Sequence, residues 1–287
     1  MHFGLIPVNV GSARPESIVA LAKKAEEVGL ESLWTFEHAI VPMDYASKYP
    51  YSADGKMGVT PETPFVDPLI ALTLVAAHTE KVRLGTGVNI LPQVSPLLLA
   101  KQAASLDVVS GGRFMLGVGI GWLKEEFEAM GVPFERRGAR FDDYIEAMRR
   151  VWSGEVVEHQ GEFVEWSGFK SHPVPAQDPF PVVIGGSKGK AFERVAKYGQ
   201  GWFSPTPSVD HLKGDLQKMT DACVEVGRDP GEIEVTCMWM PQMGLDSVKA
   251  FADLGVSRLV VPVFAFGRGN PAEALEKFAE EVIQAVS

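Results

Sequence analysis

One histidine stands where its side chain could take part in proton transfer. His38 closely follows the run SLWTF (32–36), whose apolar, aromatic and β-branched residues are typical of a buried strand. An imidazole at the end of a strand can donate a hydrogen bond to a bound ligand, or exchange a proton with it near neutral pH. The alternative is a histidine that only satisfies carbonyl groups of its own loop. His38 is therefore a candidate catalytic residue.

The segment GGSKGK (185–190) has the composition of a phosphate-binding turn. It follows an apolar strand-like run and precedes a helical pattern. Backbone N–H groups at Gly185 and Gly186, the Ser187 hydroxyl and the dipole of the following helix could bind a phosphate, and Lys188 or Lys190 could add positive charge. Gly-Gly-Ser is also an ordinary turn between a strand and a helix, so both interpretations stay open.

Glycines gather in three clusters, at 85–87, 117–121 and 185–186. Since glycine has no side chain, such clusters permit a large, flat ligand to lie against the backbone. The alternative is that small residues relieve crowding inside the fold. A dinucleotide fingerprint G-x-G-x-x-G is excluded, because counting from Gly117 or Gly119 puts Trp122 or Lys124 at the third glycine.

Short apolar runs alternate with longer helical patterns along the whole chain, which is typical of βαβ units and a parallel sheet. The predicted strands cover residues 2–9, 32–36, 82–91, 113–119, 181–185, 201–204, 232–240 and 257–264. The helices that follow them are predicted at 15–28, 68–79, 96–109, from Trp122 onward, and at 188–198, 208–227, 246–254 and 271–285.

This alternation predicts a (β/α)₈ TIM barrel that forms a single domain over residues 1–287. Two insertions interrupt it, one after strand two at about 37–65 and one at about 131–180, which carries a helix (141–152) and a hairpin turning at Gly161. Either insertion could be a lid, a substrate wall or a subunit contact. Active sites of this fold lie at the carboxyl ends of the strands. That rule selects Asn9, Glu37, His38, Gly87, Val88, Asn89, Gly119, Ile120, Gly121, Trp122, Gly185, Gly186, Ser187 and Ser204.

Composition narrows the classes of partner. A formal net charge of −10 opposes binding to nucleic acid or anionic lipid, and no apolar run is long enough to span a membrane. No signal peptide precedes the first strand, which predicts a cytoplasmic protein. Cys223 and Cys237 are expected to be buried free thiols, and no histidine or carboxylate spacing predicts a metal site.

The chain resembles the luciferase-like monooxygenase superfamily and, within it, the branch of oxidoreductases that use the deazaflavin coenzyme F420. The resemblance rests on LWTFEHAIVP, YPYSADGK, DPLIALTLVAAHTEKVRLGTGVNILP and VIGGSKGKAFERVAKYGQGWF. It also rests on the long segment from PLLLAKQAASLDVV through SGGRFMLGVGIGWLKEEFEAMGVPFERRGARFDDYIEAMRRVW. Together these segments cover most of residues 1–205.

The resemblance implies where a planar tricyclic cofactor would lie. A non-proline cis peptide beneath the ring maps to Gly87–Val88, followed by Asn89, and the acid-histidine pair facing the ring maps to Glu37 and His38. The turn after strand four would contact the ring or its side chain through Gly119, Ile120, Gly121 and Trp122, and the phosphate would lie at Gly185, Gly186, Ser187 and Lys188. Some deazaflavin dehydrogenases carry a catalytic glutamate after that turn, where this chain has Trp122, so their acid-base scheme is not carried over.

Three functions follow as alternatives. The first is an F420-dependent oxidoreductase that transfers hydride between the deazaflavin and an organic substrate, with His38 as proton donor or polarising group. The second is a monooxygenase that uses reduced FMN and oxygen, and the third is a non-catalytic flavin-binding barrel. The family suggests a homodimer. Arg136, Arg137 and Arg140 are possible cofactor contacts, but a capping or surface role is an equal alternative.

Overall fold

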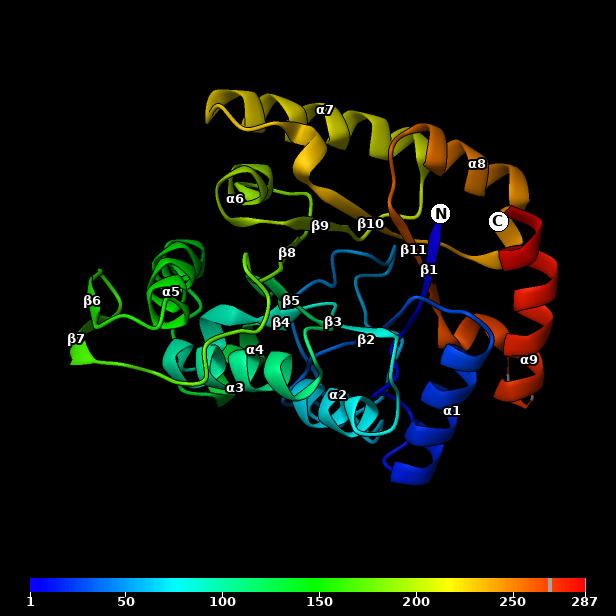
Figure 1. The fold of residues 1–287 in the computed structure, drawn as a ribbon, viewed down its shortest axis with the longest axis horizontal. Coiled ribbons are helices and arrows are strands. Elements are labelled where there is room, and N and C mark those ends of the chain that lie inside the picture. Colours follow the sequence, from blue (N-terminus) through cyan, green and yellow to red (C-terminus); the bar gives the residue numbers. More distant parts are fainter. Residues whose placement is uncertain (268–269, 287) are drawn as a thin grey trace.

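The computed structural model, which describes residues 1–267 and 270–286, contains a closed parallel barrel surrounded by helices (Figure 1). The strand order is β3-β2-β1-β11-β10-β9-β8-β5-β4, and a further pairing of β3 with β5 closes the sheet. The strands are β1 (His2–Ile6), β2 (Ser32–Thr35), β3 (Arg83–Thr86), β4 (Asn89–Ile90), β5 (Phe114–Gly119), β8 (Val182–Gly185), β9 (Gly201–Ser204), β10 (Glu234–Met238) and β11 (Arg258–Pro262). The segments β3 and β4 are two parts of the predicted strand 82–91, so the predicted TIM barrel is confirmed.

The helices follow the strands in the predicted order. They are α1 (Pro15–Glu27), α2 (Pro68–Ala76), α3 (Pro96–Val109), α4 (Lys124–Ala129), α5 (Arg137–Trp152), α6 (Ala191–Tyr198), α7 (Val209–Glu225), α8 (Leu245–Asp253) and α9 (Pro271–Phe278). Proline opens α1, α2 and α3, where its missing N–H costs no helical hydrogen bond. The helix predicted from Trp122 begins at Lys124 and is short.

The helix predicted inside the second insertion belongs to the outer ring of the barrel. It is α5, which packs along α3, and in Figure 1 it stands between α3 and α6. The predicted hairpin is formed by β6 (Val157–Gln160) and β7 (Glu165–Phe169), on the outer side of α5. Within the second insertion, the additions to the barrel are therefore the hairpin and the connections around α5.

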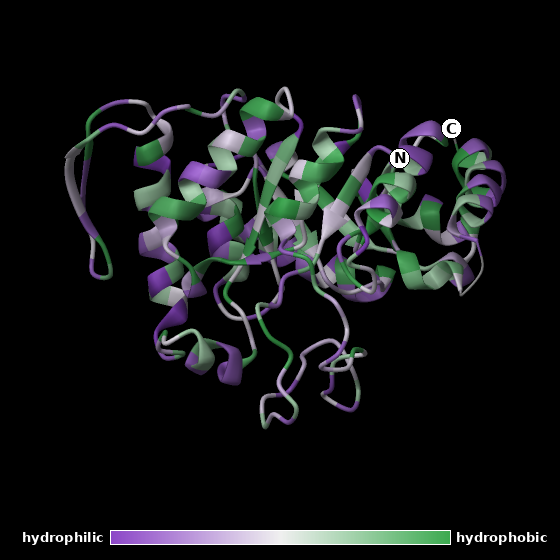
Figure 2. Cartoon of the chain, turned by 90° about the horizontal axis from the view of Figure 1, so that it is seen from below, coloured by the Kyte–Doolittle hydropathy of each residue, from purple (hydrophilic) through white to green (hydrophobic). Residues whose placement is uncertain are grey.

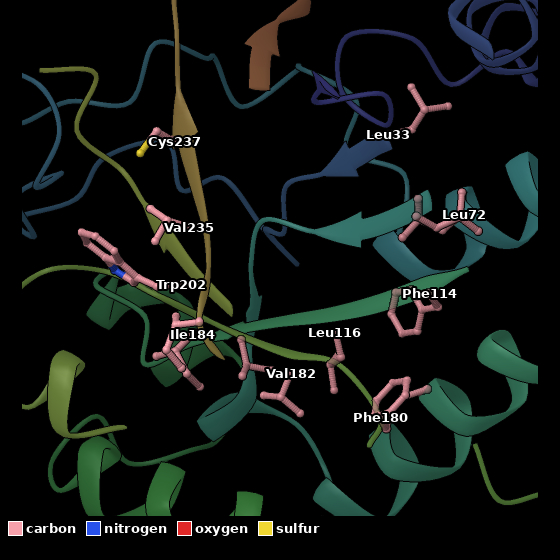
Figure 3. Close-up of a cluster of buried hydrophobic side chains, with 14 of the residues drawn as sticks. Leu33, Leu72, Phe114, Leu116, Phe180, Val182, Ile184, Trp202, Val235 and Cys237 are labelled. Carbon is pink, nitrogen blue, oxygen red and sulfur yellow. The ribbon is translucent and has the colours of Figure 1, made fainter. Parts of the chain in front are cut away.

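Apolar side chains fill two layers on either side of the sheet, because successive residues of a strand point to opposite faces. Inside the barrel, Trp34 and Phe203 pack edge to face, with Ile6, Met115, Val183 and Val260 around them. Figure 3 shows part of the outer layer, where Leu116, Val182 and Ile184 project from the strands. Cys223 and Cys237 are buried free thiols, as predicted. The interior of the barrel is thus a packed core.

Hydropathy follows this arrangement: in Figure 2 the central strands are mainly hydrophobic and the helices around them carry hydrophilic positions. Over the described parts of the chain, no helix combines the length and the apolar character that crossing a membrane requires.

Candidate active site

His38 lies at the carboxyl end of the barrel, held by a carboxylate from another element. Its Nδ1 is 3.1 Å from Oε2 of Glu126, on α4. The His38 side chain is 12% exposed and that of Glu126 is 2% exposed. No described residue forms a hydrogen bond with Nε2 of His38. The imidazole therefore keeps one nitrogen for a ligand.

Aromatic rings from the first insertion and from the turn after β5 surround this imidazole. The ring of His38 meets Phe65 and Trp122 edge to face, at centroid distances of 5.6 and 6.0 Å. Tyr45 and Tyr49 pack in turn against Trp122. Because these rings are large and mostly apolar, they can shield a reacting atom beside His38 from water.

The first insertion is fastened to the barrel at its base and at α4. The Asn9 side chain donates hydrogen bonds to the carbonyls of Phe36 and Val66, one at each end of the loop. Glu125 Oε1 accepts hydrogen bonds from the backbone N–H groups of Ala46 (2.7 Å) and Ser47 (3.1 Å). The loop is therefore folded onto the same chain's site elements, as a lid would be.

Glu37 turns toward the break between β3 and β4. This break, at Gly87 and Val88, is called the bulge of strand three below. Its Oε1 accepts a hydrogen bond of 2.7 Å from the Asn89 side chain, and its Oε2 accepts one from the backbone N–H of Ile90. Burial raises the pKa of Glu37 to about 7, and the neighbouring carboxylates of Glu126 and Asp67 add to the shift. Both oxygens are engaged by β4, so the carboxylate supports the bulge. A catalytic role for Glu37 remains a proposal.

The raised pKa of Glu37 predicts that stability declines with pH. Between its ordinary value of 4.5 and about 7, the folded state holds a proton that the unfolded state has lost. The contribution of this carboxyl to stability is therefore fully present below about pH 4.5 and is lost as pH rises through about 7. Glutamine cannot lose a proton, so the thermal stability of Glu37→Gln should rise relative to that of the wild type as the pH increases above 7. A difference that does not change between pH 5 and 8 would contradict the shift.

The predicted cis peptide between Gly87 and Val88 is present, and the packing of residues 86–88 accounts for Gly117, Gly119 and Gly185. The side chain of Val88 occupies the space beside Gly119 and Gly185, where an added methyl group would lie 2.7 and 2.8 Å from its Cγ atoms. An added methyl at Gly117 would lie 1.7 Å from the carbonyl oxygen of Thr86. At these positions the packing explanation holds, because protein atoms fill the space that a ligand would need.

Gly117→Ala should accordingly destabilise the protein, by about 1–3 kcal/mol or more, since the obstacle is backbone and cannot rotate away. The matched control is Gly214→Ala on α7, where an added methyl group meets no atom within 4 Å. That change should stabilise by about 0.5–1 kcal/mol, because alanine is the better helix former. Urea unfolding measures both; equal stability of Gly117→Ala and the wild type would refute the packing explanation.

The turn after β8 has the open space that the other glycines lack. Gly186 has a φ of +103°, and no atom of the described residues lies within 4 Å of where a Cβ would be. Lys190 is the N-cap residue of α6 and makes no side-chain hydrogen bond there. In the first turn the N–H of Ala191 donates to the carbonyl of Lys188 (3.3 Å), whereas those of Phe192 and Glu193 have no partner among the described residues. Lys188 is exposed, and neither it nor Ser187 has a side-chain partner among the described residues. This turn fits an anionic group.

The three arginines of the second insertion have different partners. Arg136 forms an ion pair with Glu162, and Arg140 donates to the carbonyls of Pro133 and Glu135.

Arg137, the first residue of α5, donates from Nε to the carbonyl of Gly121 (3.1 Å), and burial lowers its pKa. Its Nη atoms have no hydrogen-bond partner in the part of the chain that the structure describes. Only Arg137 thus keeps donors available beside the turn after β5.

The donors and acceptors at this end of the barrel fit a flavin-like ligand. Asn89 is 3% exposed, and its Oδ1 has no partner among the described residues, so it can accept a hydrogen bond from an N–H group of a ring. The open turn at Gly186 and Ser187 can accept a phosphate, as argued above. Ile120 packs on the barrel core, and Gly121 is enclosed by Ile90 and Phe127, so these two residues shape the site without offering polar side chains.

Sequence reasoning missed Glu126 and Gln93. Both are buried, and the Gln93 amide lies 3.3 Å from Glu126 Oε2. The only available signal was helical spacing, which puts Leu123 and Phe127 on the buried face of α4 and Glu126 beside them. The run KEEFEA does not by itself indicate which of its glutamates forms the hydrogen bond with His38.

The closed parallel sheet with its surrounding helices makes this chain a (β/α)₈ barrel, with an imidazole, an open turn and a cis peptide at the carboxyl ends of its strands. Residues 2–284 match the family described as luciferase-like monooxygenase. The chain belongs to this family, which supports a role as an oxidoreductase.

Relatives with described activities use two kinds of cofactor. An uncharacterised protein of Mycobacterium tuberculosis is 34% identical over 277 residues, which cover 93% of this chain and 95% of that protein. An FMNH₂-dependent dimethylsulfone monooxygenase of Pseudomonas putida is 32% identical over 151 residues, covering 51% of this chain and 41% of that protein. The structure of coenzyme F420-dependent tetrahydromethanopterin reductase from Methanopyrus kandleri superposes with a TM-score of 0.75 at 18% identity, covering 100% and 99% of the two chains.

Proposed function

We propose that this protein is an F420-dependent oxidoreductase, which transfers a hydride between the deazaflavin and an organic substrate. The observation that carries the choice of cofactor is the turn at 186–189. It is open around Gly186 and Gly189, and its exposed Lys188 has no partner among the described side chains. A long acidic tail, which F420 carries and FMN lacks, could pass over this lysine. FMN with oxygen is the second candidate, supported by the monooxygenase relative.

Each residue of the site has a role in this proposal. Ser187, Lys188 and Arg137 would hold the phosphate and the start of the tail, and Asn89 would meet a ring N–H. Gly186 would leave space for them, because its own N–H donates to the carbonyl of Phe203 (3.3 Å). When bound, the cofactor supplies or accepts the hydride. In the direction that adds hydride to the substrate, the imidazolium form of His38 gives the proton on its Nε2 atom to the substrate atom beside the one that receives hydride; in the reverse direction the neutral Nε2 atom removes that proton. The aromatic rings around His38 would exclude water and line the substrate pocket; they belong to Tyr45, Tyr49, Phe65 and Trp122.

Paired titrations test the cofactor. Purified protein is titrated with F420 and with FMN in the same buffer, following the fluorescence of each ligand. Micromolar binding of F420 with weak binding of FMN supports the proposal. The reverse preference would make the protein an FMN monooxygenase, and binding of neither would favour a non-catalytic barrel. Ser187→Ala should weaken binding of the preferred cofactor, because a hydrogen bond to a charged group is lost.

A second copy of this chain is proposed as the partner, docked on the outer face of α2 and α3. Helix α2 has no charged residue, and its Ile70 is 68% exposed. On α3, Leu98 and Val109 are 57% and 67% exposed. Exposed apolar positions on neighbouring helices are typical of an interface between subunits.

The proposed dimer predicts that charged substitutions in its interface halve the molar mass of the protein in solution. The double variant Ile70→Asp/Leu98→Asp should be a monomer by light scattering coupled to size exclusion, whereas the wild type should be a dimer. The control is Val224→Asp on α7, an equally exposed apolar position at 66% that lies outside this face. A monomeric wild type, or a dimer that survives the double substitution, would rule out this interface.

A further inference from the structure

We propose that Glu126 is a positioning residue that fixes the proton of His38 on Nδ1 and so presents Nε2 as the reactive nitrogen. This inference rests on the proposed role of His38, but it concerns a residue that contacts His38 and not the cofactor. It is carried by the hydrogen bonds that converge on the Glu126 carboxylate.

Four donor groups surround this carboxylate. The backbone N–H groups of Ala39 (2.6 Å) and Ile40 (3.3 Å) donate to Oε1. Oε2 lies 3.1 Å from Nδ1 of His38 and 3.3 Å from the side-chain nitrogen of Gln93. A buried carboxylate with its four lone-pair positions can accept all of them. The side chain is 2% exposed, so no bulk water competes for these oxygens.

This geometry determines the tautomer of the imidazole. An ionised carboxylate only accepts hydrogen bonds, so the nitrogen that faces it must carry the proton. In the neutral ring, Nε2 then has the lone pair, and the rings of Phe65 and Trp122 contact the same imidazole edge to face. Glu126 also holds Ala39 and Ile40, near the start of the first insertion, so one carboxylate fixes both the ring and this part of the loop.

Glu126→Gln makes a sharp test because an amide has one accepting oxygen and one donating nitrogen. Backbone N–H groups cannot accept, so the amide oxygen is expected to stay with Ala39 and Ile40. The amide nitrogen then faces Nδ1 of His38, which must accept, and the proton of the neutral ring moves to Nε2. Gln93 can rotate its amide to present oxygen to the new group. The substitution should therefore reverse the tautomer with little change in shape.

The readout is the long-range ¹H–¹⁵N spectrum of cofactor-free protein labelled at histidine nitrogens, with His38 assigned by loss of its signals in His38→Asn. The wild type should show the proton on Nδ1, and Glu126→Gln should show it on Nε2. Glu125→Gln is the matched control, because its neighbouring carboxylate also accepts two lid N–H groups but does not touch His38. It should leave the His38 signals unchanged.

The wild-type spectrum alone can overturn the inference: a proton on Nε2 would do so even if Glu126→Gln fails to fold. An unchanged tautomer in the folded variant would also refute it. Because these spectra need neither cofactor nor substrate, they are independent of the proposed function. In the active enzyme, Glu126→Gln should lower kcat by about 10²-fold without weakening cofactor binding, and adding His38→Ala should cost little more.

Discussion

Replacing His38 with alanine is expected to lower turnover by about 10²- to 10⁴-fold while leaving cofactor affinity nearly unchanged. The expected loss is the contribution of one positioned proton donor or acceptor. The imidazole is held by Glu126 and framed by Phe65 and Trp122, at the end of the barrel opposite the strand N-termini. The turn at Gly186 and Ser187, which is proposed to bind the phosphate, belongs to a different loop, so these proposed contacts should survive the substitution.

The measurement is the rate of oxidation of reduced F420, or of reduction of the oxidised form, with the acceptor or donor found in a substrate screen. Cofactor affinity is measured separately by fluorescence titration. The control is His78→Ala, because this exposed histidine follows the C-terminal end of α2 and, among the described residues, its ring contacts the carbonyl of Leu74 alone. Unchanged turnover in His38→Ala would remove this residue from the mechanism, and a large loss of cofactor affinity would reassign it to binding.

Replacing Arg258 with methionine is expected to lower the free energy of unfolding by about 3–5 kcal/mol, because it leaves carboxylates without their buried partner. Arg258 is 1% exposed at the start of β11, and its guanidinium contacts both oxygens of Glu31, at 2.6 and 2.7 Å. It also donates to Thr236 (3.0 Å) and lies 3.3 Å from Glu234. This network joins β10 and β11 to the start of β2, at the end of the barrel away from the site.

Urea unfolding measures the effect. Lys277→Met is the control, because its pair with Glu281 is exposed, at 71% and 63%, and such pairs contribute little. The double variant Glu31→Met/Arg258→Met should recover part of the lost stability, since an apolar pair replaces a Glu31 carboxylate that has lost its bidentate partner and keeps the longer pair with Arg83, at 3.7 Å. If Arg258→Met unfolds at the same urea concentration as the wild type, the network does not hold these strands together.

The sequence by itself predicted the barrel, because the alternation of short apolar runs with helical patterns is a local property of the chain. It also placed His38 and the turn at Gly185 to Ser187 at strand ends, since in this fold every strand delivers its last residues to the same end. The hairpin around Gly161 and the buried thiols followed from equally local patterns.

Only the tertiary structure decided which residues act together. Glu126 lies far from His38 along the chain, and nothing in its neighbourhood of acidic residues singles it out. Gly119 and Gly185 make room for Val88, a contact that arises only when β5 and β8 close around the cis peptide between β3 and β4. Local patterning fixes which residues form an element and which face is apolar, whereas the partner of a buried polar group depends on how distant elements pack, which no short stretch of sequence records.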